Sequence, residues 1–128
     1  MHERKTEDPQ DIKERSFDFA IRVVSLCQTL ESQSRISRTL ANQLLRSGTS
    51  IGANIEEAHG SQSKADFVAK MYISCKEARE TNYWLRLLTA TGIIQETKLA
   101  DLTDESSQLI TILTTIVKKT RGERKSEK

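Results

Sequence analysis

Hydrophobic residues recur every three or four positions along most of the chain, in four segments separated by short polar links. No alternating polar and apolar stretch of useful length is present in the sequence, so this period predicts amphipathic α-helices. The predicted helices span about residues 9–31, 35–59, 64–91 and 98–121. Short links between long helices predict an all-α fold, an antiparallel up-down-up-down four-helix bundle, in one domain covering the 128 residues.

Residues that begin and end helices stand at the predicted boundaries. Ser34, Ser63 and Thr97 are candidate N-caps of the second, third and fourth helices, because a hydroxyl oxygen accepts a hydrogen bond from an unpaired N–H group. Gly60 follows the second helix, where glycine can adopt a left-handed conformation and end the helix, and Gly92 ends the third.

The first and third helices carry more apolar surface than one bundle can bury. In the first helix, Phe17, Ala20, Ile21 and Val24 form one stripe. A second stripe, roughly 130° away at 100° per residue, consists of Phe19, Val23, Leu26 and Leu30. The corresponding outward residues of the third helix are Ile73, Trp84 and Leu87. Since exposed apolar patches mark interfaces and Trp often anchors them, these seven residues are predicted to mediate self-association. Alternatively, loops or the N-terminal segment cover them.

Two glycines, Gly48 and Gly52, lie inside the second helix, four positions apart. Each costs about 1 kcal/mol relative to alanine in a helix interior. Ile51 and Ile55 keep the hydrophobic phase of the residues before them. We therefore expect the glycines to admit a close neighbouring backbone, and we do not expect the helix to break.

Three polar residues, Asn54, Glu57 and Glu80, fall at the edges of the predicted core faces. A polar side chain at a bundle seam needs a hydrogen-bond partner and can fix register or subunit number. We predict that these residues belong to one polar network, and the alternative is simple exposure to solvent.

The chain lacks the residue combinations of familiar enzymes and metalloproteins. Glu56 and His59 have the Glu-x-x-His spacing of di-iron bundles, but the second copy that such a site needs is missing. The two cysteines, Cys27 and Cys75, form neither a disulfide framework nor a Cys-x-x-Cys motif. The sequence has no Gly-x-Ser-x-Gly elbow. We expect no enzyme activity, no metal and no cofactor.

Charge is distributed unevenly although the formal net charge is only +2. Residues 118–128 contain six basic and two acidic residues, so the rest of the chain is close to neutral. A neutral body is unlike that of a dedicated duplex-DNA binder. The basic tail can hold a polyanion such as RNA, or can be merely solvated. The candidate nucleic-acid contacts are Lys118, Lys119, Arg121, Arg124, Lys125 and Lys128.

The N-terminal residues are too polar for a signal peptide, and the sequence has no run of eighteen apolar residues. These features predict a cytoplasmic protein without a membrane partner.

Two motifs in the chain resemble a known family. The first is Ser-Ile-x-x-Asn-Ile-x-Glu, at residues 50–57, and the second is Glu-Thr-x-Tyr-Trp-Leu, at residues 80–85. Together they resemble the bacterial four-helix bundle family named after proteins encoded in intervening sequences of 23S ribosomal RNA genes, over residues 16–118. This chain has Ala58 where the family has a glycine, and Gly60 follows two positions later.

The resemblance implies a bundle that assembles into a homo-oligomeric ring, typically a homopentamer. A related bundle, the accessory protein of diversity-generating retroelements, binds a reverse transcriptase and nucleic acid through a basic ring, and the nearly neutral body of this chain departs from that pattern. The resulting interpretation is a non-enzymatic scaffold or RNA-associated accessory protein. The alternative is a protein–protein adaptor with no nucleic-acid role.

Overall fold

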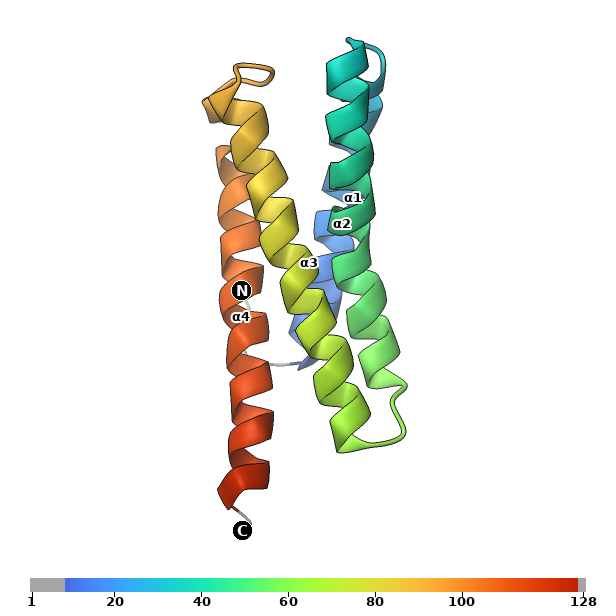
Figure 1. The fold of residues 1–128 in the computed structure, drawn as a ribbon, viewed down its shortest axis with the longest axis vertical. Helices are drawn as coiled ribbons and strands as arrows, with labels where there is room; N and C mark the ends of the chain where they lie inside the picture. Colours follow the sequence, from blue (N-terminus) through green and yellow to red (C-terminus); the bar gives the residue numbers. More distant parts are fainter. Residues whose placement is uncertain (1–8, 127–128) are drawn as a thin grey trace, which may run out of the picture.

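Four α-helices joined by three short connections make up the computed structural model, which describes residues 9–126 (Figure 1). Side-chain surroundings are described for residues 11–122. The helices are α1 (Pro9–Glu31), α2 (Arg35–His59), α3 (Lys64–Ala90) and α4 (Glu96–Ser126). No strand occurs in this part of the chain, so the prediction of an all-α fold with four helices is confirmed.

The predicted caps of α2 and α3 are confirmed. Ser34 and Ser63 have extended backbones, and their hydroxyl oxygens accept hydrogen bonds from the N–H groups of Ser37 and Asp66 at 3.1 Å and 3.0 Å. Each bond satisfies one of the N–H groups that a helix leaves unpaired at its start.

Two other boundary predictions are wrong. Gly60 has φ −95°, so it ends α2 without the left-handed conformation; that conformation occurs at Gly92, where φ is 75°. Thr97 is not a cap, because α4 already begins at Glu96.

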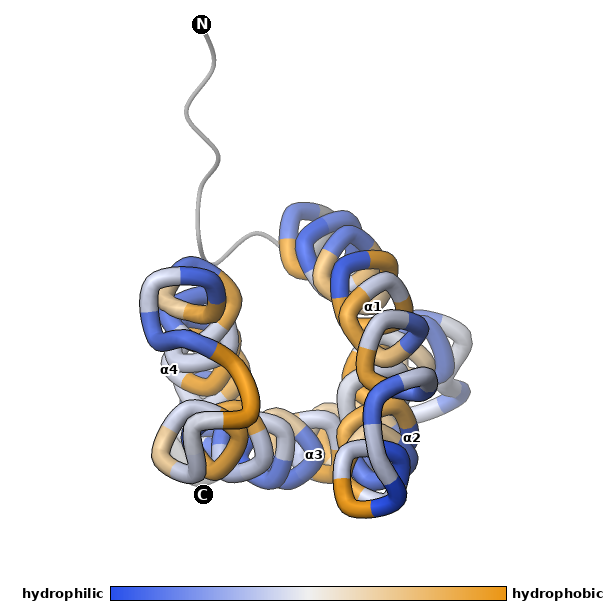
Figure 2. The backbone as a smooth tube through the Cα atoms, turned by 90° about the horizontal axis from the view of Figure 1, so that it is seen from above, coloured by the Kyte–Doolittle hydropathy of each residue, from blue (hydrophilic) through white to orange (hydrophobic). Residues whose placement is uncertain are grey.

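The helices follow one another around the bundle, so that each packs on the next in the sequence (Figure 2). The α1–α2 and α3–α4 connections lie at one end and the α2–α3 connection lies at the other (Figure 1). The first and last helices touch far less extensively than the three consecutive pairs. Their contact includes a bidentate ion pair, in which Nε and Nη2 of Arg15 donate to the carboxylate of Glu105 at 3.0 Å and 2.7 Å.

Close packing of α1 on α2 depends on the two interior glycines of α2. A Cβ atom on Gly48 would lie 2.8 Å from Val23 Cγ1, and one on Gly52 would lie 3.2 Å from Ser16 Oγ. The helix continues through both glycines, as predicted, and the neighbour that comes close is α1.

No helix in the described residues has an apolar stretch long enough to cross a membrane.

Candidate interface and nucleic-acid contacts

One face of α1 carries an apolar stripe that the protomer leaves exposed. We call it the α1 stripe, and it consists of Phe17, Ile21 and Val24, which are 61%, 53% and 38% exposed. The spacing of four and three residues places all three side chains on one side of the helix. Exposed aromatic and branched side chains in a row are typical of an interface.

The sequence prediction chose the other stripe of α1, and the structure corrects that choice. Phe19, Val23 and Leu30 are at most 1% exposed and belong to the core of the protomer, while Leu26 is partly buried against that core. The two stripes are equally apolar, so their composition could not decide between them. The glycines of α2 pack against the inner face of α1, where a Cβ on Gly48 would meet Val23 and one on Gly52 would meet Ser16.

The predicted interface residues of α3 are partly accessible. Ile73 is 40% exposed, whereas Trp84 and Leu87 are half-buried. The indole of Trp84 packs against the core, and its ring meets that of Tyr83 edge-on, with the centroids 5.0 Å apart. The two helices are not neighbours, since α2 lies between α1 and α3 around the bundle (Figure 2).

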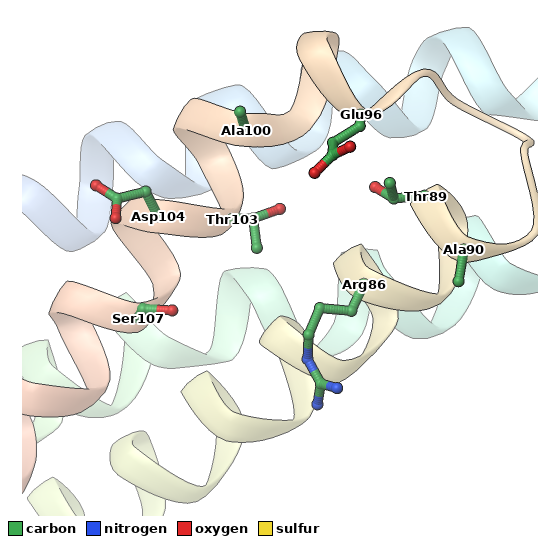
Figure 3. Close-up of a pocket in the computed structure, with 8 residues that line it drawn as sticks. All are labelled: Arg86, Thr89, Ala90, Glu96, Ala100, Thr103, Asp104 and Ser107. Atoms are coloured by element: carbon green, nitrogen blue, oxygen red, sulfur yellow. The ribbon is translucent and has the colours of Figure 1, made fainter.

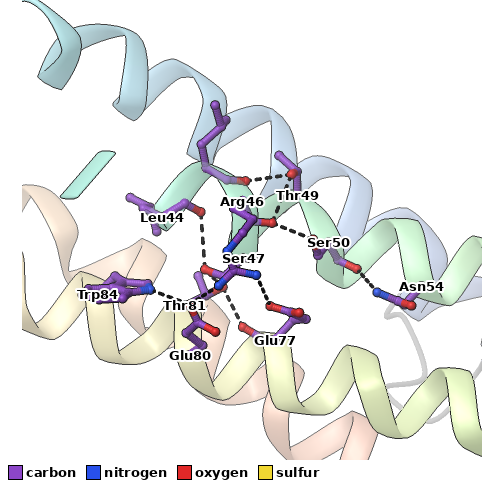
Figure 4. Close-up of polar contacts among 11 residues, drawn as sticks. Leu44, Arg46, Ser47, Thr49, Ser50, Asn54, Glu77, Glu80, Thr81 and Trp84 are labelled. Carbon is purple, nitrogen blue, oxygen red and sulfur yellow. Dashed lines mark hydrogen bonds and ion pairs between the residues drawn. The ribbon is translucent and has the colours of Figure 1, made fainter. Parts of the chain in front are cut away.

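A polar cluster joins α2 to α3 beside this surface (Figure 4). The guanidinium of Arg46 donates to the carboxylates of Glu80 and Glu77, with 3.2 Å between Arg46 Nη1 and Glu77 Oε1. Trp84 Nε1 also donates to Glu80, at 3.0 Å. The hydrogen bond from Arg46 is the main reason that the pKa of Glu80 lies below its ordinary value.

The predicted network of Asn54, Glu57 and Glu80 is not formed. Asn54 Nδ2 donates within its own helix, to the carbonyl oxygen of Ser50 at 2.8 Å, and it lies well away from Glu80 (Figure 4). Glu57 is exposed. Only Glu80 has a polar partner on another helix, and that partner is Arg46.

Sequence reasoning missed two polar contacts that are buried between α2 and α3. Thr81 Oγ1 donates to Ser47 Oγ at 2.9 Å, and Ser74 Oγ donates to the carbonyl oxygen of Ile51 at 2.8 Å. All three hydroxyl residues are fully buried. The sequence feature that could have revealed them is a small hydroxyl side chain at a position that the helical period assigns to the core.

Three of the six predicted nucleic-acid contacts lie on the described part of α4. Lys118, Lys119 and Arg121 are exposed, and Arg121 lies 5.4 Å from the ring centroid of Tyr72. The side chains of Arg124, Lys125 and Lys128 lie outside the described residues. Since α4 extends to Ser126, five residues beyond the predicted end, the basic segment continues this helix.

The Glu-x-x-His spacing of α2 does not produce a metal site in the described part of the chain. No group of three or more His, Cys, Asp or Glu residues there is arranged to hold a metal ion. His59 Nδ1 lies 2.8 Å from the carbonyl oxygen of Ile55, and its ring meets Phe67 edge-on. The thiol of Cys27 lies 3.3 Å from the carbonyl oxygen of Ala41, and burial raises its pKa to about 11.

A surface groove of about 640 Å³ lies between α3 and α4, near their connection (Figure 3). Its lining combines small side chains, hydroxyls, two carboxylates and one guanidinium: Arg86, Thr89, Ala90, Glu96, Ala100, Thr103, Asp104 and Ser107. The Arg86 side chain extends away from the two carboxylates (Figure 3).

Comparison with known proteins identifies the family. The family model described as 23S rRNA-intervening sequence protein matches residues 9–115. The chain is also similar to a solved structure from Bacteroides thetaiotaomicron VPI-5482, described as a protein with unknown function from the S23 ribosomal protein family. The two are 40% identical with a TM-score of 0.79, covering 86% of this chain and 97% of that one. No curated protein matches significantly. The chain therefore belongs to the 23S rRNA-intervening sequence protein family.

Proposed function

We propose that this family member is a cytoplasmic, non-enzymatic scaffold or RNA-associated accessory protein. In this proposal the chain is an antiparallel up-down-up-down bundle, and its copies assemble into a homo-oligomeric ring. The observation that carries the proposal is the α1 stripe, whose Phe17 and Ile21 side chains are more than half exposed. Burying that apolar surface against another copy removes it from water and stabilises the assembly.

A ring is favoured over a symmetric dimer because the protomer presents two different apolar surfaces. The α1 stripe is one, and the surface of α3 around Ile73, which is 40% exposed, and the half-buried Trp84 is the other. When unlike surfaces pair, the contact is head-to-tail and repeats from copy to copy until the ring closes. The family resemblance supports five copies.

The RNA role is supported by the basic end of α4. Lys118, Lys119 and Arg121 are exposed there, and the sequence continues with further basic residues. A ring brings several such segments to one particle, so weak contacts by each copy add up to a larger avidity.

RNA binding across a salt series tests this role directly. Fluorescence anisotropy would follow a labelled RNA with the full-length protein and with a chain ending at Val117. We expect binding by the full-length protein to weaken steeply with salt, since each neutralised phosphate of a single strand contributes about −0.7 to the slope of log K against log salt. Truncation should weaken binding and reduce that slope.

Two results would contradict the proposal in different ways. An intact oligomer that binds no RNA at low salt excludes the nucleic-acid role and supports the protein–protein adaptor. A full-length protein that stays monomeric at all concentrations excludes the ring. Circular dichroism of the truncated chain controls for loss of helix.

A further inference from the structure

An exposed stripe of aromatic and basic residues runs along α3. Its members are spaced by four, three, four and three residues, which places them on one face of the helix. All five are exposed: Tyr72, Lys76, Arg79, Tyr83 and Arg86. We call this the tyrosine–cation stripe. At 1.5 Å per residue it extends about 21 Å along the helix.

Cations lie over both tyrosine rings of the stripe. Lys76 Nζ is 5.9 Å from the ring centroid of Tyr72, and the guanidinium of Arg121, from α4, is 5.4 Å from the same centroid. The guanidinium of Arg86 is 5.9 Å from the ring centroid of Tyr83. The tyrosine–cation stripe therefore continues onto α4 through Arg121.

The stripe itself contains no carboxylate. Other cations form ion pairs within residues 11–122, among them Lys13, Arg15, Arg46 and Lys70. Arg86 lines the groove between α3 and α4 but points away from its two carboxylates, Glu96 and Asp104 (Figure 3). The result is a locally positive strip on a body whose total charge is close to neutral.

We propose that the tyrosine–cation stripe, together with Arg121, binds single-stranded RNA on the bundle itself. Bases stack on the exposed rings of Tyr72 and Tyr83, and phosphates contact the cations that lie between and beside those rings. Alternating aromatic and positive side chains are the combination that single-strand binding requires, because every base has a face to stack and every nucleotide has a phosphate. The inference rests on the proposed RNA role and places part of the binding on α3.

Base stacking predicts a preference for unpaired strands. In an RNA duplex the base faces are stacked on one another, and side chains reach mainly the backbone and the minor groove. We therefore expect a single-stranded RNA of about twelve nucleotides to bind the full-length protein more tightly than a duplex of the same length.

Substitution of the tyrosines in the full-length protein tests the stacking. Tyr72→Ala and Tyr83→Ala should each weaken binding of the single-stranded RNA by roughly five- to one-hundredfold. Tyr72→Phe and Tyr83→Phe should retain the affinity, because they keep the ring. Both substituted positions are exposed, and thermal unfolding followed by circular dichroism checks that the fold is unaffected.

A charge-matched pair of variants tests the phosphate contacts. Lys76→Gln with Arg79→Gln removes two cations from the stripe, whereas Arg35→Gln with Arg38→Gln removes two exposed cations from α2. The first variant should reduce the magnitude of the salt slope by about 1.4, since two phosphate contacts are lost. The α2 variant should leave the slope unchanged.

The failures of the two proposals can be told apart. If the full-length protein binds no RNA, the proposed function itself is wrong. If it binds RNA and the tyrosine variants bind equally well, the stripe is not the site. Equal affinity for single and double strands also overturns the inference. So does a loss of affinity that light scattering traces to a smaller particle, because the stripe would then act in assembly.

Discussion

The packing of α1 on α2 predicts that the effect of Gly48→Ala on the free energy of unfolding changes sign when the contact with Val23 is removed. Alanine is normally about 1 kcal/mol more favourable than glycine inside a helix. At Gly48, however, the new Cβ would lie 2.8 Å from Cγ1 and 3.0 Å from Cγ2 of Val23. Overpacking of a tight core costs about 1–3 kcal/mol, so Gly48→Ala should lower the free energy of unfolding by about 1 kcal/mol.

Removing the methyl groups of Val23 should reverse that effect. Val23→Ala alone leaves a cavity and costs roughly 2 kcal/mol. In that background the two closest atoms, Cγ1 and Cγ2, are gone and the nearest remaining atom is the Cβ at position 23, 3.3 Å away, so Gly48→Ala should raise the free energy of unfolding by about 1 kcal/mol. The coupling between the two positions is then about 2 kcal/mol, which is large enough to measure in a double-mutant cycle.

Urea unfolding followed by circular dichroism at 222 nm would measure these free energies. The protomer concentration must be the same for every variant, because an oligomer gains apparent stability with concentration. Gly122→Ala is the matched control, since a Cβ there meets nothing within 4 Å and should not destabilise the protein. If Gly48→Ala stabilises the wild-type background as well, the close approach of α1 is wrong.

Three further predictions concern single side chains. Glu105→Gln removes the charge partner of Arg15 at the α1–α4 contact, where the two side chains are 22% and 12% exposed, and should lower the free energy of unfolding in urea by about 1–2 kcal/mol. The pKa of Glu80 is lowered mainly by the hydrogen bond from Arg46. The stability that this pair contributes is therefore complete above the ordinary pKa of a glutamate, about 4.3, and is lost as the pH falls through the lower pKa of the folded state. Unfolding measured at decreasing pH should show a smaller loss of stability in Glu80→Gln than in the wild type. The thiol of Cys27, with a pKa of about 11, should react with iodoacetamide at pH 8 far more slowly in the native protein than in urea.

The helices and two of their caps could be predicted because their causes are local. The hydrophobic period of each helix lies within one segment, and Ser34 and Ser63 act on N–H groups three residues away. The end of α4 was harder to predict, although its cause is also local. Arginine, glutamate and lysine around Gly122 favour a helix strongly enough that one glycine, costing about 1 kcal/mol, does not end it.

The candidate site depended on contacts between helices, which the sequence alone does not display. Two apolar stripes of α1 competed for the core, and the fit of Val23 against Gly48 selected the inner one. Glu80 finds Arg46 on α2, 34 positions earlier in the chain, whereas Asn54 bonds within its own helix. The sequence correctly indicated excess apolar surface on α1, but the outward residues are Phe17, Ile21 and Val24.

The central claim is that the α1 stripe holds copies of the chain together, and the molar mass in solution tests it most directly. Light scattering coupled to size-exclusion chromatography would compare the wild type with Phe17→Glu/Ile21→Glu. Asn42→Glu/Gln43→Glu is the control, because it adds the same charge at exposed polar positions of α2, on another helix from the α1 stripe. The account predicts a multiple of the 14.5 kDa chain mass for the wild type and the control, and a smaller particle for the stripe variant. A wild-type monomer, or a stripe variant whose mass equals that of the wild-type oligomer, would contradict it.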